Sequence, residues 1–242
     1  MNNKQTVLIT GANKGIGLET ARQLLQAGYH IFLGSRDKDR GDKAIEQLKS
    51  EGFTDVELLL IDVTSEQSVQ QANDQLAQKI DHLDVLINNA GIPGAFPQLG
   101  TTVSDDTMKE VFEVNFFGVI RTVKAFIDLL KKAENPRIVN VTSDLGSLTY
   151  HNDPDWEHYH VKSAAYGPSK TALNAYTVAL AYELKDQVKV NMVNPGYTNT
   201  EFNNNQGPKP VEDGAAPIVK YAMLDKDGPT GKYVSDYGET PW

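Results

Sequence analysis

A tyrosine and a lysine four positions apart are the residues of this sequence best suited to proton transfer. Tyr166 and Lys170 stand in the segment YGPSK, and side chains at this spacing share one face of a helix. A free tyrosine has a pKa of about 10, but a nearby ammonium favours the phenolate and lowers that pKa. The pair is therefore a candidate acid–base unit, although pairs at this spacing also occur by chance on helix surfaces.

Two further polar residues strengthen this hypothesis. Ser143 follows a predicted strand at 137–141, and its hydroxyl could hold a substrate oxygen beside the tyrosine. A local turn hydrogen bond is the alternative role for this serine. Asn115 is a polar residue in an otherwise apolar helical segment, and a buried asparagine is usually hydrogen-bonded. We expect it either to bend the helix or to hold a water molecule near Lys170.

A glycine-rich segment, TGANKGIG at 10–17, predicts a binding site for a phosphate group. It follows the first predicted strand and opens the first predicted helix. There Gly11 permits a tight turn, Gly15 lets the backbone approach a pyrophosphate, and Gly17 lets the helix pack against the sheet. The free N–H groups and the positive dipole end of the helix favour an anion. A glycine-rich connector without a ligand is the alternative, and it fits this strand–turn–helix context poorly.

The residues after the second predicted strand bear on the choice between NAD and NADP. An acidic residue there binds the ribose 2′-hydroxyl of NAD, whereas an arginine accommodates the 2′-phosphate of NADP. Ser35 occupies the expected acidic position, Arg36 follows it, and Lys14 could reach the same phosphate. We therefore predict NADP(H). Asp37 is the counter-evidence, since a longer strand would make it the acidic residue, and a solvated surface is the alternative role for the two cations.

Short apolar runs alternate with longer amphipathic segments, and these elements must position the candidate residues. The predicted strands cover 7–9, 30–33, 56–61, 85–87, 137–141, 188–193 and 232–234. The predicted helices cover 16–27, 39–50, 65–80, 105–132 with a break, 164–185 and 212–224. Continuous apolar strands are buried on both faces, and strand–helix alternation indicates parallel crossovers. The pattern predicts a single-domain α/β protein over 1–242, with a doubly wound (Rossmann) fold of about seven parallel strands and helices on both faces.

Composition narrows the function classes. The chain has 242 residues and a net charge of −9, which argues against nucleic-acid binding because phosphate backbones repel an acidic protein. It has no cysteine, which excludes disulfides, thiolate zinc sites and cysteine nucleophiles. No signal peptide can be placed at the start, and no apolar run could span a bilayer. We expect a cytoplasmic protein that acts on a small molecule, without a membrane partner.

Several motifs together resemble those of the short-chain dehydrogenase/reductase family. They appear in that family's order and cover nearly the whole chain: TGANKGIG at 10–17, Asp62-Val63, NNAG at 88–91, Asn115, Ser143, YGPSK at 166–170 and Pro195-Gly196. The greatest similarity is to the NADPH-dependent carbonyl reductases, through NKGIGLE at 13–19, SRD at 35–37, VNFFG at 114–118 and the ending GPTGKYVSD…PW. The resemblance implies an oxidoreductase that reduces an aldehyde, ketone or quinone to an alcohol.

The resemblance also implies a role for each matched residue. Tyr166 would protonate the developing alkoxide, and Ser143 would hold the carbonyl oxygen. Lys170 would lower the pKa of the tyrosine and bind the nicotinamide ribose, while Asn115 would hold a water molecule in a proton relay. The hydride would pass directly from the nicotinamide to the carbonyl carbon. NADP(H) would be bound by Gly11, Asn13, Lys14, Gly15, Ile16, Gly17, Ser35, Arg36, Asp62, Val63, Asn89, Ala90, Gly91, Tyr166, Lys170, Pro195, Gly196, Thr198 and Thr200.

The connection between Ser143 and Tyr166 carries a polar insertion at about 148–162, where monomeric carbonyl reductases have a larger one. We expect it to cover the active site or to block a helix-pairing dimer interface, so a homo-oligomer and a monomer both stay open. A solvated insertion anchored by Trp156 is the preferred interpretation, and we predict no metal. The alternative is a metal site built from His151, Asp153, Asp155, His158 and His160.

Two other functions stay open beside carbonyl reduction. The same residues would catalyse alcohol oxidation, so a dehydrogenase specific for one metabolite is the first alternative. A catalytically silent NADP-binding sensor is the second. The intact set of Tyr166, Lys170, Ser143 and Asn115 argues against the sensor, because a sensor needs only the phosphate-binding segment.

Overall fold

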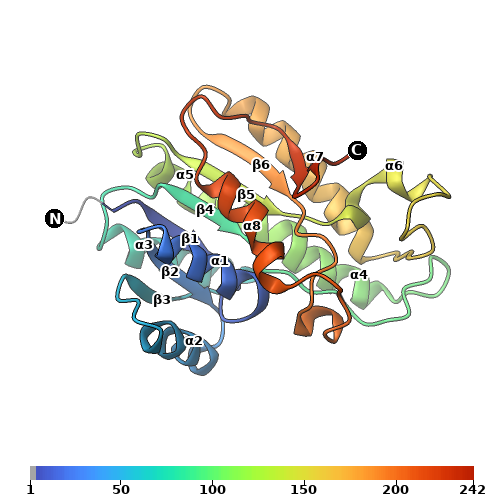
Figure 1. Ribbon diagram of the computed structural model, residues 1–242, viewed down its shortest axis with the longest axis horizontal. Coiled ribbons are helices and arrows are strands. Elements are labelled where there is room, and N and C mark those ends of the chain that lie inside the picture. The colour runs from blue at the N-terminus through green and yellow to red at the C-terminus, as the bar shows by residue number, and fades with distance from the viewer. Residues whose placement is uncertain (1–3) are drawn as a thin grey trace.

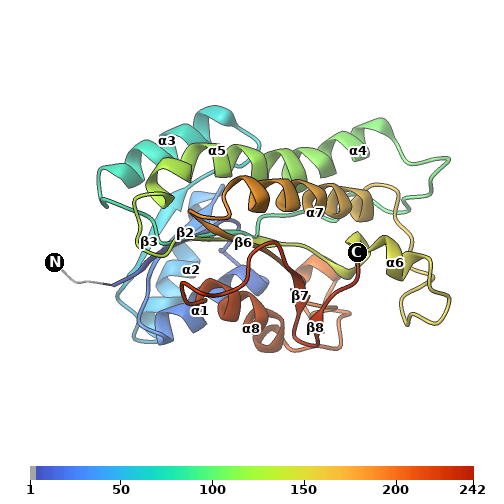
Figure 2. The same cartoon turned by 90° about the horizontal axis from the view of Figure 1, so that it is seen from above.

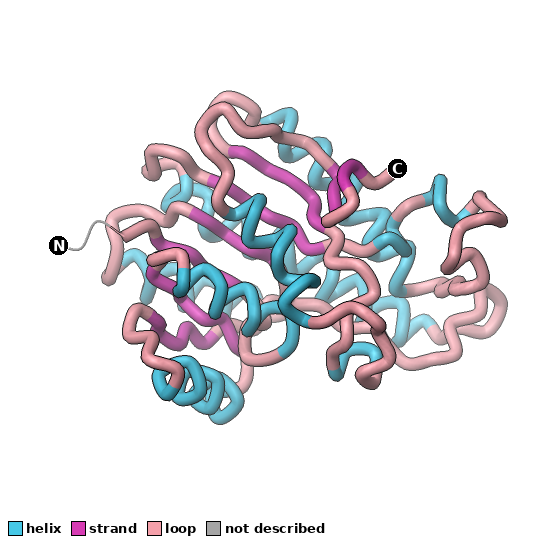
Figure 3. The backbone as a smooth tube through the Cα atoms, viewed as in Figure 1, coloured by secondary structure: helices cyan, strands magenta, loops and turns pink. Residues whose placement is uncertain are grey.

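The apolar runs of the sequence form one continuous sheet in the computed structural model, which describes residues 4–242. Its strands are β1 (Thr6–Ile9), β2 (His30–Ser35), β3 (Val56–Leu60), β4 (Val85–Asn88), β5 (Arg137–Val141), β6 (Lys189–Val193), β7 (Tyr233–Ser235) and β8 (Gly238–Glu239). Their order is β3-β2-β1-β4-β5-β6-β7-β8 (Figures 1 and 3). The seven predicted strands are all present and parallel. β8 adds an antiparallel edge that the sequence analysis missed, because two residues are too few to show a pattern.

Helices cover both faces of the sheet, as predicted. They are α1 (Gly15–Gln26), α2 (Lys38–Ser50), α3 (Glu66–Ala77), α4 (Asp105–Phe112), α5 (Gly118–Leu130), α6 (Leu148–His151), α7 (Tyr166–Glu183) and α8 (Val211–Ala222). In Figure 2, α1, α2 and α8 lie on one side of the sheet, and α3, α5 and α7 on the other. The short α6 lies in the insertion, for which we expected only a polar stretch. No helix within residues 4–242 combines the length and the apolar character needed to cross a membrane.

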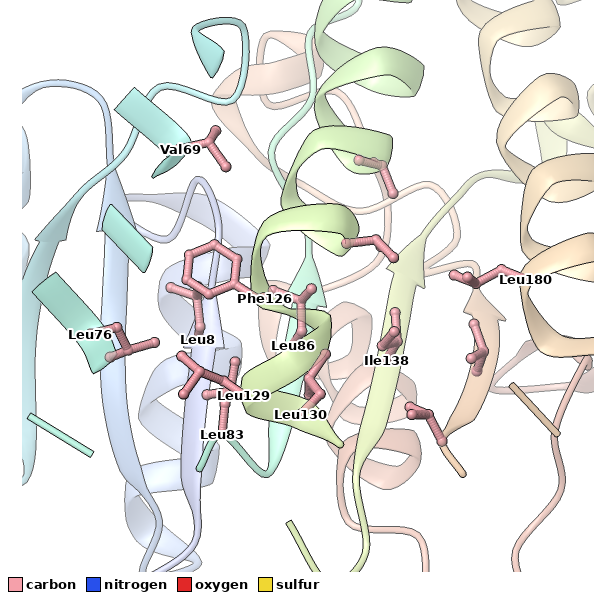
Figure 4. Packing of buried hydrophobic residues seen from close by; sticks show 14 of the residues in the cluster. Leu8, Val69, Leu76, Leu83, Leu86, Phe126, Leu129, Leu130, Ile138 and Leu180 are labelled. Carbon is pink, nitrogen blue, oxygen red and sulfur yellow. The ribbon is translucent and has the colours of Figure 1, made fainter. Parts of the chain in front are cut away.

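Each face of the sheet has its own hydrophobic core. Successive residues of a strand point to opposite faces, so Leu8 joins the core under α3, α5 and α7, while Val7 and Ile9 join the core under α1, α2 and α8. Phe126 of α5 is fully buried and lies over Leu8 in the first core (Figure 4). Burial on both faces explains why the strands read as continuous apolar runs.

The predicted break in the long helix is a π-helical turn. The turn covers Glu113–Phe117 and joins α4 directly to α5. Such a turn accommodates an extra residue in a helix, and it is frequent at functional sites. Here it points Asn115 into the protein, where its side chain is fully buried. The sequence indicated the break through this single polar residue in an apolar segment.

The order of the strands determines where a ligand can bind. The chain moves outward from β1 to β3 in one direction and then from β4 to β7 in the other, so the order reverses between β1 and β4. In doubly wound sheets a crevice forms at this reversal, outside the carboxyl ends of the strands. The loops after β1, β4, β5 and β6 therefore carry the residues that matter for function.

Candidate active site

Three of the four predicted catalytic residues meet where β5 and α7 come together. Ser143 follows β5, and Tyr166 and Lys170 occupy the start of α7. The Nζ atom of Lys170 lies 5.9 Å from the centroid of the Tyr166 ring. The same atom donates a hydrogen bond to the carbonyl of Val141 at 2.9 Å. Since Val141 ends the strand that leads to Ser143, this bond holds the lysine next to the serine.

Burial determines the protonation of the tyrosine and the lysine. It raises the pKa of Tyr166 to about 12, with the Ser143 side chain acting in the opposite direction and the charge of Asp144 adding to the increase. Burial also lowers the pKa of Lys170 to about 8. The tyrosine pKa therefore moves against the direction that the Tyr–Lys spacing suggests. At neutral pH Tyr166 is protonated and suited to donating a proton.

Asn115 connects the catalytic helix to the loop after β4. Its Oδ1 accepts a hydrogen bond from the backbone N–H of Ile92 at 2.9 Å, and its Nδ2 donates to the carbonyl of Ile92 at 3.0 Å. The Nδ2 also donates to Oγ of Ser169, the neighbour of Lys170, at 3.1 Å. Both parts of the amide are therefore used, and the residue lies within the π-helical turn.

The glycine-rich segment forms a cradle that only glycine permits. Gly11 and Gly15 have positive φ angles of 62° and 56°. A Cβ atom on Gly11 would lie 2.8 Å from Cα of Ala90, and one on Gly17 would lie 2.5 Å from Nδ2 of Asn89. No described side chain caps the N-terminus of α1, so its first N–H groups are available to an anion. The cradle fits the pyrophosphate of a dinucleotide, and Asn13 and Ile16 belong to it.

The region after β2 carries charges of both signs, and several of them are paired. Asp37 caps α2 by accepting a hydrogen bond from the backbone of Arg40 at 3.0 Å, and it also pairs with the Arg40 side chain. The buried Ser35 donates its hydroxyl hydrogen to the carbonyl of Asp37 at 2.8 Å. Arg36 is exposed, and Lys14 pairs with Glu201 at 2.7 Å. Asp37, the acidic residue that could have bound the ribose 2′-hydroxyl, is therefore used to cap α2. Arg40 is a further cation at this end of the site.

The other predicted cofactor residues lie at the same edge of the sheet, in the loops after β3, β4 and β6. They are Asp62, Val63, Asn89, Ala90, Gly91, Pro195, Gly196, Thr198 and Thr200. The side chain of Asn89 donates hydrogen bonds to the carbonyls of Thr10 and Gly11 at 2.9 and 3.0 Å, which joins the loop after β4 to the cradle. A Cβ atom on Gly91 would lie 3.7 Å from Nζ of Lys170. The loop after β4 thus lies between the cradle and Lys170.

The insertion at 148–162 is held by aromatic contacts. Tyr150 stacks on Trp156 with ring centroids 5.0 Å apart, and His158 meets Trp156 edge to face at 5.5 Å. His158 also contacts Tyr197 in the loop after β6 at 5.8 Å, so the insertion reaches the loop that carries predicted cofactor residues. Within residues 4–242, no three histidine, aspartate or glutamate side chains are grouped so that they could hold a metal ion.

The sequence analysis missed Gln98, which holds the start of the catalytic helix. Its buried Oε1 accepts hydrogen bonds from the backbone N–H groups of Ala165 at 3.2 Å and Tyr166 at 3.0 Å. Its Nε2 donates to the carbonyl of Pro93 at 2.7 Å. No side chain at the Ala165 position caps α7, so a residue from a distant loop does so instead. Nothing in a loop rich in proline and glycine signals this role.

The sequence analysis also missed Asp144, although its position directly after Ser143 is a signal. Asn194 and Tyr237 both donate hydrogen bonds to its Oδ1 atom. Burial raises the pKa of the Asp144 carboxyl, and its charge contributes to the pKa of Tyr166. A carboxyl group therefore stands close enough to Tyr166 to act on its pKa.

Comparisons with known proteins show which family this chain belongs to. A family model described as short chain dehydrogenase matches residues 5–210. Short-chain dehydrogenase/reductase 1 from Saponaria officinalis is 32% identical over 295 aligned residues, which cover 99% of this chain and 96% of that protein. The alignment is longer than the 242 residues of this chain, so the relative carries extra segments.

Two solved structures have the same fold. The alcohol dehydrogenase of the archaeon Thermococcus sibiricus, complexed with 5-hydroxy-NADP, is 28% identical, with a TM-score of 0.80 and 94% of each chain covered. The NADPH-bound carbonyl reductase from chicken fatty liver is 24% identical, with a TM-score of 0.85 and 99% of each chain covered. With its family match, its fold and its motifs, this chain belongs to the short-chain dehydrogenase/reductase family of oxidoreductases.

Proposed function

We propose that this protein reduces an aldehyde, ketone or quinone to an alcohol with NADPH, using Tyr166 as the general acid. One observation carries the proposal: a tyrosine that is protonated at neutral pH stands with Ser143 and a buried Lys170 at the edge of the sheet that also carries the glycine cradle. A protonated phenol can give its proton to a developing alkoxide. The three groups lie at the same edge of the sheet as the cradle that would hold a dinucleotide.

The chain's residues also support NADP(H) as the cofactor. The N–H groups at the start of α1 would bind the pyrophosphate, and Lys14, Arg36 and Arg40 would bind the 2′-phosphate. The cofactor bound by the Thermococcus sibiricus enzyme is an NADP derivative, and the carbonyl reductase is bound to NADPH. When bound, NADPH supplies the hydride for the reaction.

Each catalytic residue then has a defined task. The hydroxyl of Ser143 donates a hydrogen bond to the substrate oxygen and holds the carbonyl in place. Tyr166 transfers its proton to that oxygen as negative charge develops on it. The ammonium of Lys170 stabilises the tyrosinate that remains and binds a ribose hydroxyl. Asn115 fixes the loop after β4 to the catalytic helix, and a water molecule next to it would return the proton to the tyrosine.

Alcohol oxidation uses the same groups in reverse, and the protonation of Tyr166 separates the two directions. In the oxidation direction Tyr166 must act as a base, which requires its phenolate form. A tyrosine with a pKa of about 12 is almost entirely protonated at neutral pH. The free protein therefore holds Tyr166 in the protonation state that carbonyl reduction requires, and a sensor without catalysis would not need the Ser143–Tyr166–Lys170 arrangement.

The first test measures NADPH consumption optically with a panel of small aldehydes, ketones and quinones. We expect turnover with NADPH and at least about tenfold weaker turnover with NADH, since a charge-assisted hydrogen bond to a phosphate contributes about 1.5–3 kcal/mol. Arg36→Ala should lower kcat/KM for NADPH about tenfold and leave NADH unaffected. Lys43→Ala, at an exposed position of α2, is the matched control. Equal use of both cofactors by the unmodified protein would contradict the NADP assignment.

The pH dependence of the reduction should report the ionisation of Lys170. The profile of kcat/KM reflects the free enzyme, so we expect a plateau that ends near pH 8, with a fall above it as the lysine loses its charge. Tyr166 does not contribute in this range because its pKa is about 12. Lys170→Arg keeps the positive charge at higher pH, so its lower rate should show no fall near pH 8. The same fall in both proteins would assign it to another group.

A further inference from the structure

Asp144 is a carboxylate beside the catalytic residues that the proposed reaction does not use. It begins a short 3-10 turn, Asp144–Gly146, directly after Ser143. Its Oδ1 atom accepts hydrogen bonds from the side chains of Asn194 and Tyr237. No described side chain in residues 4–242 hydrogen-bonds to the other oxygen, Oδ2, although the side chain is only partly exposed. One oxygen of the carboxylate is thus held by hydrogen bonds, and the second is available to a ligand.

The negative charge of Asp144 has no ion-pair partner among the described residues. Lys209 and His158 are the nearest basic groups that act on it. The Nζ atom of Lys209, however, is bound by Asp236 at 2.9 Å and by the carbonyl of Pro195 at 3.2 Å. Since Lys209 is already paired with Asp236, the charge of Asp144 next to the proton donor has no ion pair within residues 4–242.

Aromatic rings extend from this carboxylate across the insertion. Tyr150 interacts with the Tyr237 hydroxyl that binds Asp144, and its ring stacks on Trp156. The row continues through His158 to Tyr197. Figures 1 and 2 show the segment around α6, which supplies the first of these rings, projecting at one end of the molecule beyond the start of α7. Aromatic faces attract cations, and the attraction grows when water is partly excluded.

We propose that Asp144, together with Tyr150, Trp156, His158 and Tyr197, forms a subsite for an ammonium group of the substrate. The inference rests on the proposed function and narrows its substrate class to carbonyl compounds that also carry a quaternary or tertiary ammonium. The carbonyl would lie at the catalytic tyrosine, and the cation would lie between the free carboxylate oxygen and the row of rings.

The charges of the insertion are consistent with a cationic ligand. Asp153, Asp155 and Glu157 are exposed on it, and Lys162 is the one basic side chain between 148 and 162 apart from histidines. The protein as a whole carries a net charge of −9. Surface charge of one sign raises the local concentration of the opposite charge, so this end of the molecule should attract cations.

The test uses two ketones of the same shape, the permanent cation 1,1-dimethyl-4-oxopiperidinium and the neutral 4,4-dimethylcyclohexanone. We expect the protein to prefer the cation by about tenfold in kcat/KM, and Asp144→Asn to remove that preference. The ratio between the two ketones is the readout, because any effect of Asp144 on Tyr166 acts on both equally. Asp128→Asn makes the same change in net charge at an exposed position of α5 and should leave the ratio unchanged.

Binding of tetramethylammonium tests the subsite without turnover. The chain has two tryptophans, so Trp242→Phe leaves Trp156 as the reporter of binding by fluorescence. We expect tetramethylammonium, but not sodium at the same ionic strength, to change this signal, with about tenfold weaker binding in the Asp144→Asn variant. Such binding without reduction of any ketone would contradict the proposed function alone. If the unmodified protein and the Asp144→Asn variant had the same ratio between the two ketones and the same affinity for tetramethylammonium, the subsite would be overturned. The proposed carbonyl reduction would not be affected by that result.

Discussion

Replacing Tyr166 with phenylalanine should lower kcat for carbonyl reduction by about 10³-fold, within the range that general acid catalysis contributes. The substitution removes the hydroxyl and keeps the ring, which contacts Phe202 with centroids 5.6 Å apart. The site therefore keeps its shape but loses its proton donor. The measurement is the steady-state rate of NADPH consumption, with NADPH affinity determined separately by fluorescence.

The same helix provides the control for this prediction. Tyr182 lies on α7 and is 78% exposed, so Tyr182→Phe removes a hydroxyl that faces solvent. We expect it to leave kcat unchanged. NADPH should bind to the Tyr166→Phe variant with nearly unchanged affinity. If that variant turned over substrate at the parent rate, another group would have to supply the proton, and the catalytic assignment would be wrong.

Replacing Gln98 with methionine should lower kcat by about 10²-fold while the KM for NADPH changes little. Methionine has a similar size but cannot accept the two N–H groups at the start of α7, and a buried unpaired donor costs about 1–3 kcal/mol. The first turn of the helix then relaxes, and a shift of the reactive group by about 1 Å can cost about 10²-fold in rate. The measurement is the separation of kcat from KM in steady-state kinetics.

The variant Gln98→Glu distinguishes a positioning role from a purely structural one. The carboxylate keeps an oxygen acceptor for Ala165 and Tyr166, and the positive end of the helix dipole favours it. It loses the hydrogen bond that Gln98 donates to Pro93. We expect Gln98→Glu to recover most of the rate that Gln98→Met loses. Equal rates in the two variants would show that the accepted hydrogen bonds do not position the tyrosine.

Most of the fold could be predicted because its signals are local. Val7, Leu8 and Ile9 are buried on both faces of a parallel sheet, so they read as a continuous apolar run. The break in the long helix was also visible, since a polar residue stood in an apolar stretch. The π-helical form of that break could not be predicted, because it depends on the hydrogen bonds that Asn115 makes to a loop more than twenty residues away in sequence.

The parts of the candidate site that belong to sequence motifs could be predicted. The parts that depend on contacts between distant residues could not. The glycine cradle and the Tyr–Lys pair have fixed spacing, and the structure brings them to the same edge of the sheet. The choice between Ser35, Arg36 and Asp37 depended on where the strand ends, and the structure answers it by using Asp37 as a helix cap. Gln98 acts across more than sixty positions, and such contacts leave no local pattern. The effect of the insertion on oligomeric state stays a prediction.

The π-helical turn also constrains how this protein can evolve. It holds one residue more than a regular helix requires, so a single deletion within Glu113–Phe117 would let α4 and α5 join without interruption. The deletion would leave the rotation of α5 relative to α4 nearly unchanged, because the turn absorbs its extra residue locally. Phe126 would keep its place in the core, whereas Asn115 would lose the wide turn that points it toward Ile92 and Ser169. Changes in length can therefore be accommodated in the exposed insertion between α6 and α7, whereas a deletion within this turn would remove the placement of Asn115.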